Sequence, residues 1–447
     1  MASKCACRLR LVLFVILGLA TAFAAYRYAL HHIVQTKLDA IREQGYPVTL
    51  AELDKWYPQP PPGQNAADLY LKAFQHDIKS ETDTNLPIVG FAHLPSRDAP
   101  LPPEMKQRIA GYLAANQESL NLLHEAAKMK FCHYPLDLSS PNTMISSQMV
   151  QYTSVRRCAK LLCLELLLAS ANGDTQRAVE SVMASRALVE SLNDRSLLIA
   201  YLIGRGCLGI TIANLEQALS RTTFTQSQLA ELSTAFRESD GANGFAHVLI
   251  GERAFADEEW DDIRKGKVLL TDLTHWNEDT NGILDLVVAV IYRPSGLIDL
   301  DYSAYLDLSA DFIRTSTIAF PQRFEQIDSI KRKVEHLRVC PLTQMYADTL
   351  VISARRDARI IAQLGAACAS LGIERFRLAN GTLPDSLGDL TPTFLNSVPT
   401  DPFNGQPLRY KKMAKGYVVY SVGEDGVDND GTEGFCPGTD ITFTVER

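Results

Sequence analysis

The chain of 447 residues lacks features that mark several common classes of protein. Its nine cysteines are scattered, and no two have the Cys-x-x-Cys spacing of a zinc or redox site. It has no long run of lysine and arginine, and its formal net charge is −8. A protein that binds nucleic acid needs a basic surface, so we expect no nucleic acid among its partners.

Motifs of the common catalytic sites are also missing. The pair His124-Glu125 continues as Ala-Ala-Lys, so the second histidine of a His-Glu-x-x-His zinc site is absent. The sequence contains neither Gly-x-Ser-x-Gly nor a Walker A loop, and no Gly-x-Gly-x-x-Gly follows a predicted strand. We therefore expect a protein that is not an enzyme.

The composition that remains is that of an ordinary globular protein. Hydrophobic residues make up 46% of the chain and charged residues 21%, which is enough for a large core, and the length predicts two or three domains. Four of the cysteines lie in apolar helical contexts and are expected to be small buried side chains: Cys158, Cys163, Cys207 and Cys368. Three lie in loop-like contexts that permit a disulfide without indicating a pairing: Cys132, Cys340 and Cys436.

The N-terminus carries a membrane-targeting signal. Three basic residues, Lys4, Arg8 and Arg10, precede residues 11–26, which contain no charge. Sixteen apolar residues are short for a membrane span, and Ala22-Phe23-Ala24 fits signal cleavage, so a removed signal peptide is one interpretation. We favour an uncleaved anchor, because Tyr26 and Tyr28 form an interfacial aromatic belt and helical spacing continues to about residue 45. The basic flank places the N-terminus in the cytoplasm and the bulk of the chain outside it.

The middle of the chain predicts a bundle of helices. Thr49 and Glu52 have the spacing of a capping box, and a proline-rich spacer follows them. Helical periodicity dominates residues 143–240, where Asn172-Gly173-Asp174 resembles the turn of a tetratricopeptide-type hairpin. The apolar helix 195–219 is expected to be a buried central helix, and the alternative is a second membrane span interrupted by Arg205.

An acidic helix follows at residues 252–266. Its carboxylates include Glu252, Glu259 and Asp262 on one side of the helix, and His275 is close in sequence. We interpret this side as a solvated acidic face, because no Glu-x-x-His repeat accompanies it. The alternative is a metal-dependent site around residues 252–275.

The C-terminal quarter of the chain changes in character. One long helical pattern covers residues 343–381 and is followed by an irregular segment. Three strands are predicted at residues 407–413, 416–422 and 440–446, the last with clean alternation of apolar and polar residues. This order predicts a long helix packed on a small antiparallel sheet.

Four motifs in this region occur in a fixed order, namely Gly381-x-x-Pro384, Asp401-Pro402-Phe403 with Pro407 and Tyr410, Tyr420-Ser421-Val422-Gly423 with Asp425-Gly426, and Asp440-Ile441. In this order they resemble the soluble domain of the major pseudopilin of type II secretion, over roughly residues 345–447. The N-terminus has no prepilin cleavage motif, so we do not expect the chain to polymerise as a pseudopilus subunit. The whole chain resembles membrane-anchored proteins of planctomycete-type bacteria, which implies an architecture and not an activity.

The pseudopilin resemblance implies a structural calcium ion in the loop between the last two strands. Carried over to this sequence, the ligands are the carbonyl of Val422 and the side chains of Asp425 and Asp440, with Asp428 and Asp430 as candidates between them. The loop here is longer than is usual in that family and includes Cys436 and Pro437. From composition alone, a hydrated acidic turn is the alternative.

Together these patterns predict a mainly α protein with a C-terminal α+β module. We expect an N-terminal segment and signal anchor at 1–30, an extracytoplasmic helical domain at 31–340, and the pseudopilin-like module at 341–447. The expected function is a membrane-tethered protein-interaction or scaffold component linked to secretion or the cell envelope. Its expected partners are the membrane, through residues 11–26, and other envelope proteins, while its oligomeric state is open.

Overall fold

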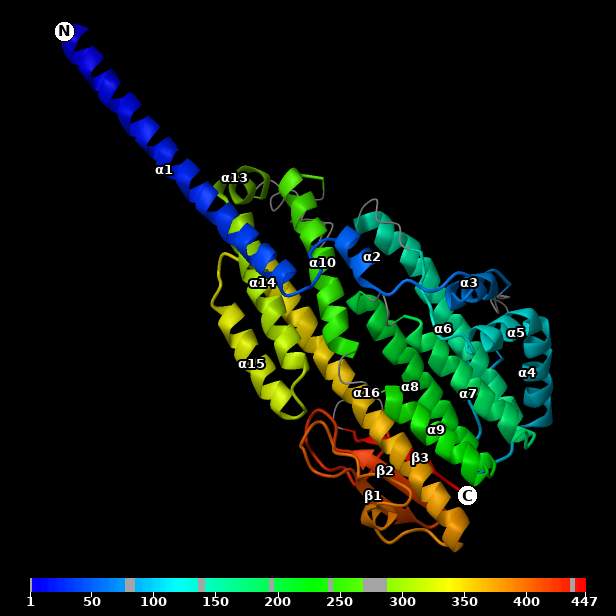
Figure 1. The fold of residues 1–447 in the computed structure, drawn as a ribbon. Coiled ribbons are helices and arrows are strands. Elements are labelled where there is room, and N and C mark those ends of the chain that lie inside the picture. The colour runs from blue at the N-terminus through cyan, green and yellow to red at the C-terminus, as the bar shows by residue number, and fades with distance from the viewer. Residues whose placement is uncertain are drawn as a thin grey trace.

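The structure, a computed structural model, is a mainly helical body from which one long helix projects (Figure 1). It describes residues 2–76, 85–135, 141–192, 197–239, 244–267, 288–434 and 439–447. A three-stranded sheet lies at the end of the body away from the projecting helix (Figure 1). The predicted fold class, mainly α with an N-terminal apolar helix and a small C-terminal antiparallel sheet, is confirmed.

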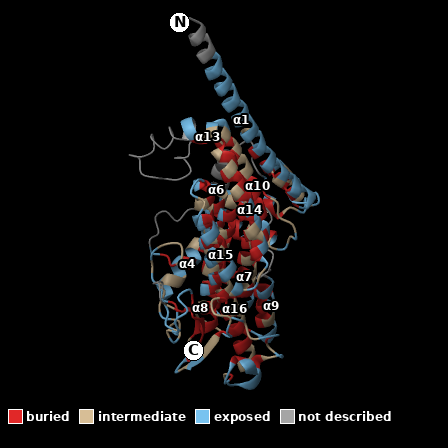
Figure 2. Cartoon of the chain, turned by 90° about the vertical axis from the view of Figure 1, so that its left-hand side faces the viewer, coloured by how far each residue is buried: buried red, intermediate tan, exposed pale blue. Residues whose placement is uncertain are grey.

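The projecting helix is α1 (Ala2–Glu43). Its described apolar residues from Leu11 to Leu19 are exposed, and it is long and apolar enough to cross a membrane. Its last part packs on the body, where Val34 and Leu38 are buried and Lys37 bonds the Asp307 carboxylate at 2.7 Å. Figure 2 shows the change from an exposed to a packed helix along α1. One continuous helix therefore joins the candidate membrane span to the body.

Short helices connect α1 to the main bundle. The capping box of α2 is confirmed, since Thr49 accepts the Glu52 N–H at 3.2 Å and Glu52 accepts the Thr49 N–H. Asn65 caps the next helix through a 3.2 Å bond from the Ala67 N–H. The bounds of these helices are α2 (Leu50–Trp56), α3 (Ala66–His76), α4 (Pro103–Ala115) and α5 (Gln117–Ala126).

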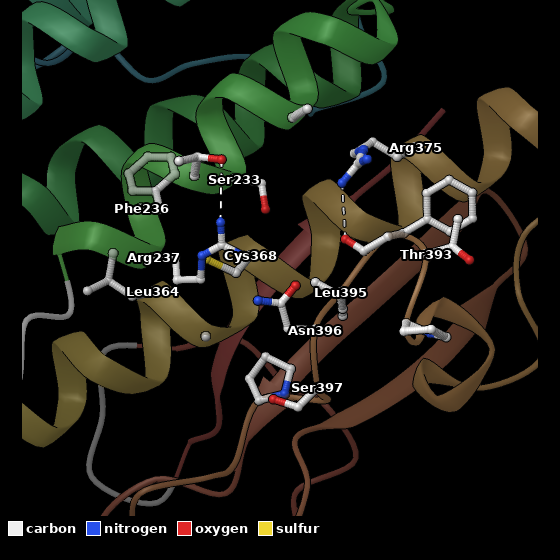
Figure 3. Close-up of a pocket in the computed structure, with 16 residues that line it drawn as sticks. Ser233, Phe236, Arg237, Leu364, Cys368, Arg375, Thr393, Leu395, Asn396 and Ser397 are labelled. Atoms are coloured by element: carbon white, nitrogen blue, oxygen red, sulfur yellow. Dashed lines mark hydrogen bonds between the residues drawn. The ribbon is translucent and has the colours of Figure 1, made fainter.

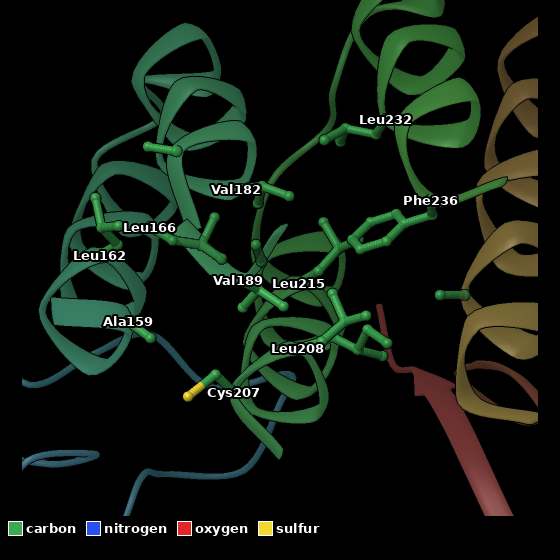
Figure 4. Close-up of a cluster of buried hydrophobic side chains, with 14 of the residues drawn as sticks. Ala159, Leu162, Leu166, Val182, Val189, Cys207, Leu208, Leu215, Leu232 and Phe236 are labelled. Carbon is green, nitrogen blue, oxygen red and sulfur yellow. The ribbon is translucent and has the colours of Figure 1, made fainter. Parts of the chain in front are cut away.

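The first core lies between helices α6 to α9 (Figure 4). The expected turn between α6 and α7 is present: Gly173 has φ +77°, and the Asp174 side chain accepts the Arg177 N–H at 3.0 Å. The apolar helix α8 is mostly buried inside the body, as expected of a central bundle helix. The likeness of this hairpin to a tetratricopeptide repeat stays a prediction. The bounds are α6 (Pro141–Ala171), α7 (Thr175–Glu190), α8 (Leu198–Arg221) and α9 (Gln226–Ser239).

A second core lies nearer to α1. It contains an aromatic cluster in which Trp260 stacks on Tyr305 at 4.7 Å between ring centroids, with Tyr302 and Tyr346 beside them. The elements around it are α10 (Gly244–Lys265), the π-helix η2 (Val288–Tyr292), α13 (Arg293–Ser295), α14 (Leu297–Ser316) and α15 (Gln322–Glu335).

Helix α16 (Pro341–Asn380) runs through both cores. Its first part, up to Ala354, packs with α14 and α15, and its second part, from Ile360, packs with α8, α9 and the sheet. Its C-cap is Gly381, whose φ of +76° suits this position. The side chains under the sheet therefore belong to the same core as helices α6 to α9. The boundary between residues 340 and 341 stays a prediction.

The sheet has the strand order β1-β2-β3, and both pairs are antiparallel. The predicted strands are confirmed as β1 (Arg409–Met413), β2 (Gly416–Ser421) and β3 (Ile441–Val445), and the one-turn 3-10 helix η3 (Leu387–Leu390) precedes them. Tyr417 opposes Val445 and Val419 opposes Phe443, and all four side chains are buried. Gly416 has φ +108°, and a Cβ atom there would collide with the Val445 carbonyl, so only glycine fits this hairpin.

Candidate functional site

A groove of about 480 Å³ lies where α9, the second half of α16 and the segment at residues 392–399 meet (Figure 3). Its apolar lining includes Phe236, Leu364 and Leu395, which come from these three elements in turn. Hydroxyl and amide groups lie beside them, including those of Ser233 and Asn396. A pocket with an apolar lining and a few convergent polar groups is the usual form of a ligand site in proteins.

Two guanidinium groups line the groove. Arg375 on α16 donates to the Phe394 carbonyl at 3.1 Å and lies over the Phe394 ring, 5.5 Å from its centroid. Arg237 on α9 is exposed, and its contact to the Thr234 hydroxyl is long, at 3.5 Å. Among the described lining residues none carries a carboxylate, and neither arginine forms an ion pair within the described part of the chain. The groove can therefore attract an anionic group beside an apolar surface.

Glu374, the residue before Arg375, faces the sheet, where other side chains bond its carboxylate. Glu374 is buried and accepts a 3.0 Å bond from the Tyr417 hydroxyl, and it pairs with Arg377 at 2.7 Å and with Arg447. Burial raises the pKa of Glu374 to about 7, against the effect of Arg377. On α16, the Glu374 carboxylate therefore points toward the sheet, while the guanidinium of Arg375 lines the groove.

A second pocket of about 310 Å³ adjoins the groove and shares Gly365 and Pro399 with it. It is lined by a buried polar network centred on Asp357. Asp357 accepts the Tyr201 hydroxyl at 2.5 Å and pairs with Arg205 at 3.3 Å and Arg323 at 3.5 Å. This network connects α8, α15 and α16 beside the groove. It therefore stabilises the position of α16, which forms one side of the groove.

The predicted calcium ligands lie in one loop but bond different partners. Asp440 is buried and accepts the backbone N–H groups of residues 429 and 431, at 3.3 and 2.8 Å. Asp428 pairs with Arg409 at 3.1 Å and Asp430 with Lys411, both on β1, while Asp425 accepts a backbone N–H two residues ahead at 3.1 Å. Basic side chains of β1 thus balance the negative charge of two loop carboxylates, and backbone N–H groups bond the other two.

These ligand positions do not form a preassembled metal cluster. Within the described residues, no group of three or more histidine, cysteine, aspartate or glutamate side chains has an arrangement that could hold a metal ion. The donors still fit calcium in kind, because all five are oxygen atoms. Cys436 lies outside the described residues, and Cys132 and Cys340 are not joined to each other by a disulfide.

Asp401, at the base of the acidic loop, belongs to one of the four motifs, but its contacts were not predicted from the sequence. Asp401 is buried and accepts the Phe403 N–H, the Ser421 hydroxyl and the Val422 N–H, each at 2.9 Å. Asp401 thus connects the turn after Pro399 to the end of β2 through hydrogen bonds. The Asp-Pro step could have indicated the local turn, whereas the contacts to β2 depend on the fold.

The expectation of a solvated acidic face on α10 is wrong. Asp262 is buried, and Glu252 and Glu259 are at least half-buried. Each bonds a different partner: Glu252 accepts the Leu198 N–H at 2.9 Å, Glu259 accepts the Tyr346 hydroxyl, and Asp262 binds Lys267 at 2.8 Å. Burial raises the pKa of Glu259 to about 7. His275 lies outside the described residues, so the metal-dependent alternative stays a prediction.

Comparison of the chain with protein-family models, with curated proteins and with solved structures finds no match. A function must therefore be inferred from the chemistry of the groove. Its described lining offers two cations, hydroxyl and amide groups and an apolar floor, and it places no histidine or carboxylate beside them. Such a lining can bind and orient an anion.

Proposed function

We propose that the protein is a membrane-tethered, extracytoplasmic binding protein, a non-enzymatic interaction or scaffold component of a secretion or cell-envelope assembly. The observation that carries the proposal is the groove with its two arginines and no described carboxylate. Helix α9 and the second half of α16, which line the groove, lie toward the end of the body remote from the projecting part of α1 (Figure 1). A partner held there would be kept away from the membrane surface.

The tether in this proposal is α1. Residues 11–26 cross the membrane, the basic residues before them stay in the cytoplasm, and the remaining chain is periplasmic or otherwise extracytoplasmic. The exposure of this apolar segment supports the assignment, because exposed hydrophobic side chains of this number need an apolar environment. Cleavage near Ala24 is the alternative.

The partner in this proposal is another envelope protein that presents a carboxylate next to an apolar side chain. The carboxylate pairs with Arg375, whose orientation is already fixed by Phe394, and Arg237 adds a second donor. The apolar side chain packs against Phe394 and Leu395, which line the groove and keep some exposed surface. A fixed guanidinium loses little rotamer freedom on binding, which favours this pairing.

Replacing both groove arginines with glutamine should weaken the partner interaction at least about tenfold, because a hydrogen bond to a charged group contributes roughly 1.5–3 kcal/mol. The measurement is a quantitative cross-linking pull-down from the native envelope with wild type and the Arg237→Gln/Arg375→Gln variant. Arg359→Gln is the matched control, since Arg359 is exposed on the same helix and does not line the groove. Equal recovery of the same partners by wild type and the double variant would refute the proposal.

A structural calcium ion in the loop at residues 422–440 is the second part of the proposal, supported by the pseudopilin resemblance and the oxygen donors. Asp425 and Asp440 would be the first ligands, with Asp428, Asp430 and the Val422 carbonyl completing the shell. The ion would have to displace the ion pairs that Asp428 and Asp430 make with β1. Its role would be to lock the loop onto the sheet.

Calcium should raise the melting temperature of the purified chain, because a ligand at about 100 times its Kd stabilises the native state by about 2.7 kcal/mol. Chelator should lower it again. Asp425→Asn is the sharpest variant, since Asp425 is exposed and makes one local backbone bond, so the change should remove most of the shift and preserve the fold. A full calcium response in Asp425→Asn, or no response in wild type, would contradict the calcium site.

The alternative function is a hydrolase or another metal-dependent enzyme with its site around residues 252–275. The observation that favours it is the burial of Glu252 and Glu259, which raises the pKa of both carboxyls. Metal analysis of the purified chain separates the two functions. Calcium alone favours the binding protein, and stoichiometric zinc, iron or manganese favours the enzyme.

A further inference from the structure

A short segment of the body lies directly beside the point where the apolar part of α1 ends. The guanidinium of Arg27 donates to the Arg293 carbonyl at 3.1 Å and pairs with Asp299 at 3.3 Å. Gly296 has φ +86° and is so close to α1 that a Cβ atom would lie 2.7 Å from Arg27 Nη1. Helix α13 and the start of α14 are thus held against Arg27, the residue that follows the candidate span, and η2 directly precedes α13 in the chain.

Two neighbouring aliphatic side chains of this segment face solvent. Val290 is 63% exposed and Ile291 54% exposed, whereas the next residue, Tyr292, is buried and bonds Asp301. Outside α1, no other two adjacent large hydrophobic residues in the described part of the chain are both exposed. Figures 1 and 2 both place α13, which follows η2 directly, at the end of the body from which α1 projects.

We infer that η2 is a second membrane contact, with Val290 and Ile291 inserted at the boundary between lipid headgroups and acyl chains. The inference rests on the anchoring proposed above, because residues 11–26 must cross the bilayer for η2 to reach its surface. The exposed rings of Tyr26 and Tyr28 flank Arg27 on α1, and such aromatic residues are typical of the membrane interface.

This contact would determine the orientation of the body relative to the membrane. A helix through the bilayer can tilt and rotate, and its orientation is set by interfacial side chains and by packing. Attachment at α1 and at η2 together restricts both motions, because α1 also packs on the body, where Val34 and Leu38 are buried and Lys37 bonds Asp307 of α14. The groove would then be presented at a defined height and direction.

Fluorescence quenching in proteoliposomes tests the inference. The full chain with Ile291→Cys, labelled with an environment-sensitive dye, is reconstituted in vesicles that contain brominated lipid. Val427→Cys is the matched control, since Val427 is also 54% exposed and lies in the loop after β2. Tyr28→Cys reports the interface at α1, and labelled wild type gives the background from native cysteines.

Quenching at position 291 should be at least threefold greater than at position 427 and comparable with that at position 28. Quenching at 291 equal to that at 427, with strong quenching at 28, would overturn the membrane contact and leave the anchor intact. Loss of quenching at 28, together with release of the chain by a carbonate wash, would overturn the anchor and the contact with it.

Discussion

Replacing Asp301 with alanine is expected to destabilise the protein by about 3 kcal/mol or more, because the loss leaves several buried donors unsatisfied. Asp301 is fully buried on α14 and accepts the Leu342 and Thr343 N–H groups, each at 3.0 Å. These are first-turn donors of α16, and Cys340 at the N-cap position supplies no side-chain bond to them. The Thr343 and Tyr292 hydroxyls also bond this carboxylate.

The loss can be measured as the shift in urea midpoint of the purified chain, followed by circular dichroism. Thr343→Val is the matched control, because it removes one hydroxyl and keeps the carboxylate on the backbone donors. We expect it to cost about 1 kcal/mol, the usual size of a single hydrogen bond. If Asp301→Ala costs no more than Thr343→Val, the carboxylate does not cap α16.

Replacing Asp357 with alanine is expected to cost about 3–5 kcal/mol, because removing one partner of a buried ion pair leaves the other charge uncompensated. Asp357 is buried on α16 and lies within 3.5 Å of guanidinium atoms of Arg205 and Arg323. The Tyr201 hydroxyl, from the same helix as Arg205, bonds the same carboxylate at 2.5 Å. The change therefore affects three helices at once.

Two variants separate the charge from the hydrogen bond. Tyr201→Phe removes one hydroxyl and should cost about 1 kcal/mol, while Asp357→Asn keeps the shape and removes the charge, with an intermediate loss. Replacing Asp357, Arg205 and Arg323 together with apolar residues of similar volume should recover much of the stability lost in Asp357→Ala. A loss in Asp357→Ala no larger than that in Tyr201→Phe would show that the ion pairs contribute little.

Asp301 and Asp357 both hold α16 in place, and α16 forms part of the groove. Asp301 fixes where the helix begins, and Asp357 fixes its contact with α8 and α15. Arg375 lies 18 residues beyond Asp357, which corresponds to about 27 Å along a helix at 1.5 Å per residue. A shift of α16 would therefore move Arg375 relative to Arg237 on α9.

Features that depend on neighbouring residues were predictable from the sequence. The capping box of Thr49 and Glu52 needs only two side chains three residues apart, and the turn at Gly173 and Asp174 needs one left-handed residue and one cap. The strand at Ile441–Val445 was indicated by alternation alone. In each case the bonds or the periodicity that make the element lie within the element itself.

Features that depend on packing were not predictable. Asp301 reaches α16 across 41 residues of sequence, and Arg237 and Arg375, separated by 138 residues, line one groove. Glu259 was expected to be exposed to solvent, because a local charge pattern does not show which other helix will pack over it. In the structure Tyr346 of α16 packs over it and bonds its carboxylate.

The sequence by itself determined where helices, strands and the apolar N-terminal segment form, since these follow from local hydrogen bonds and hydropathy. Only the tertiary structure decided which charges are buried, which donors cap distant helices and where two arginines meet. The physical reason is that burial and long-range pairing are properties of surfaces brought together by folding, and no single segment of the chain contains both surfaces.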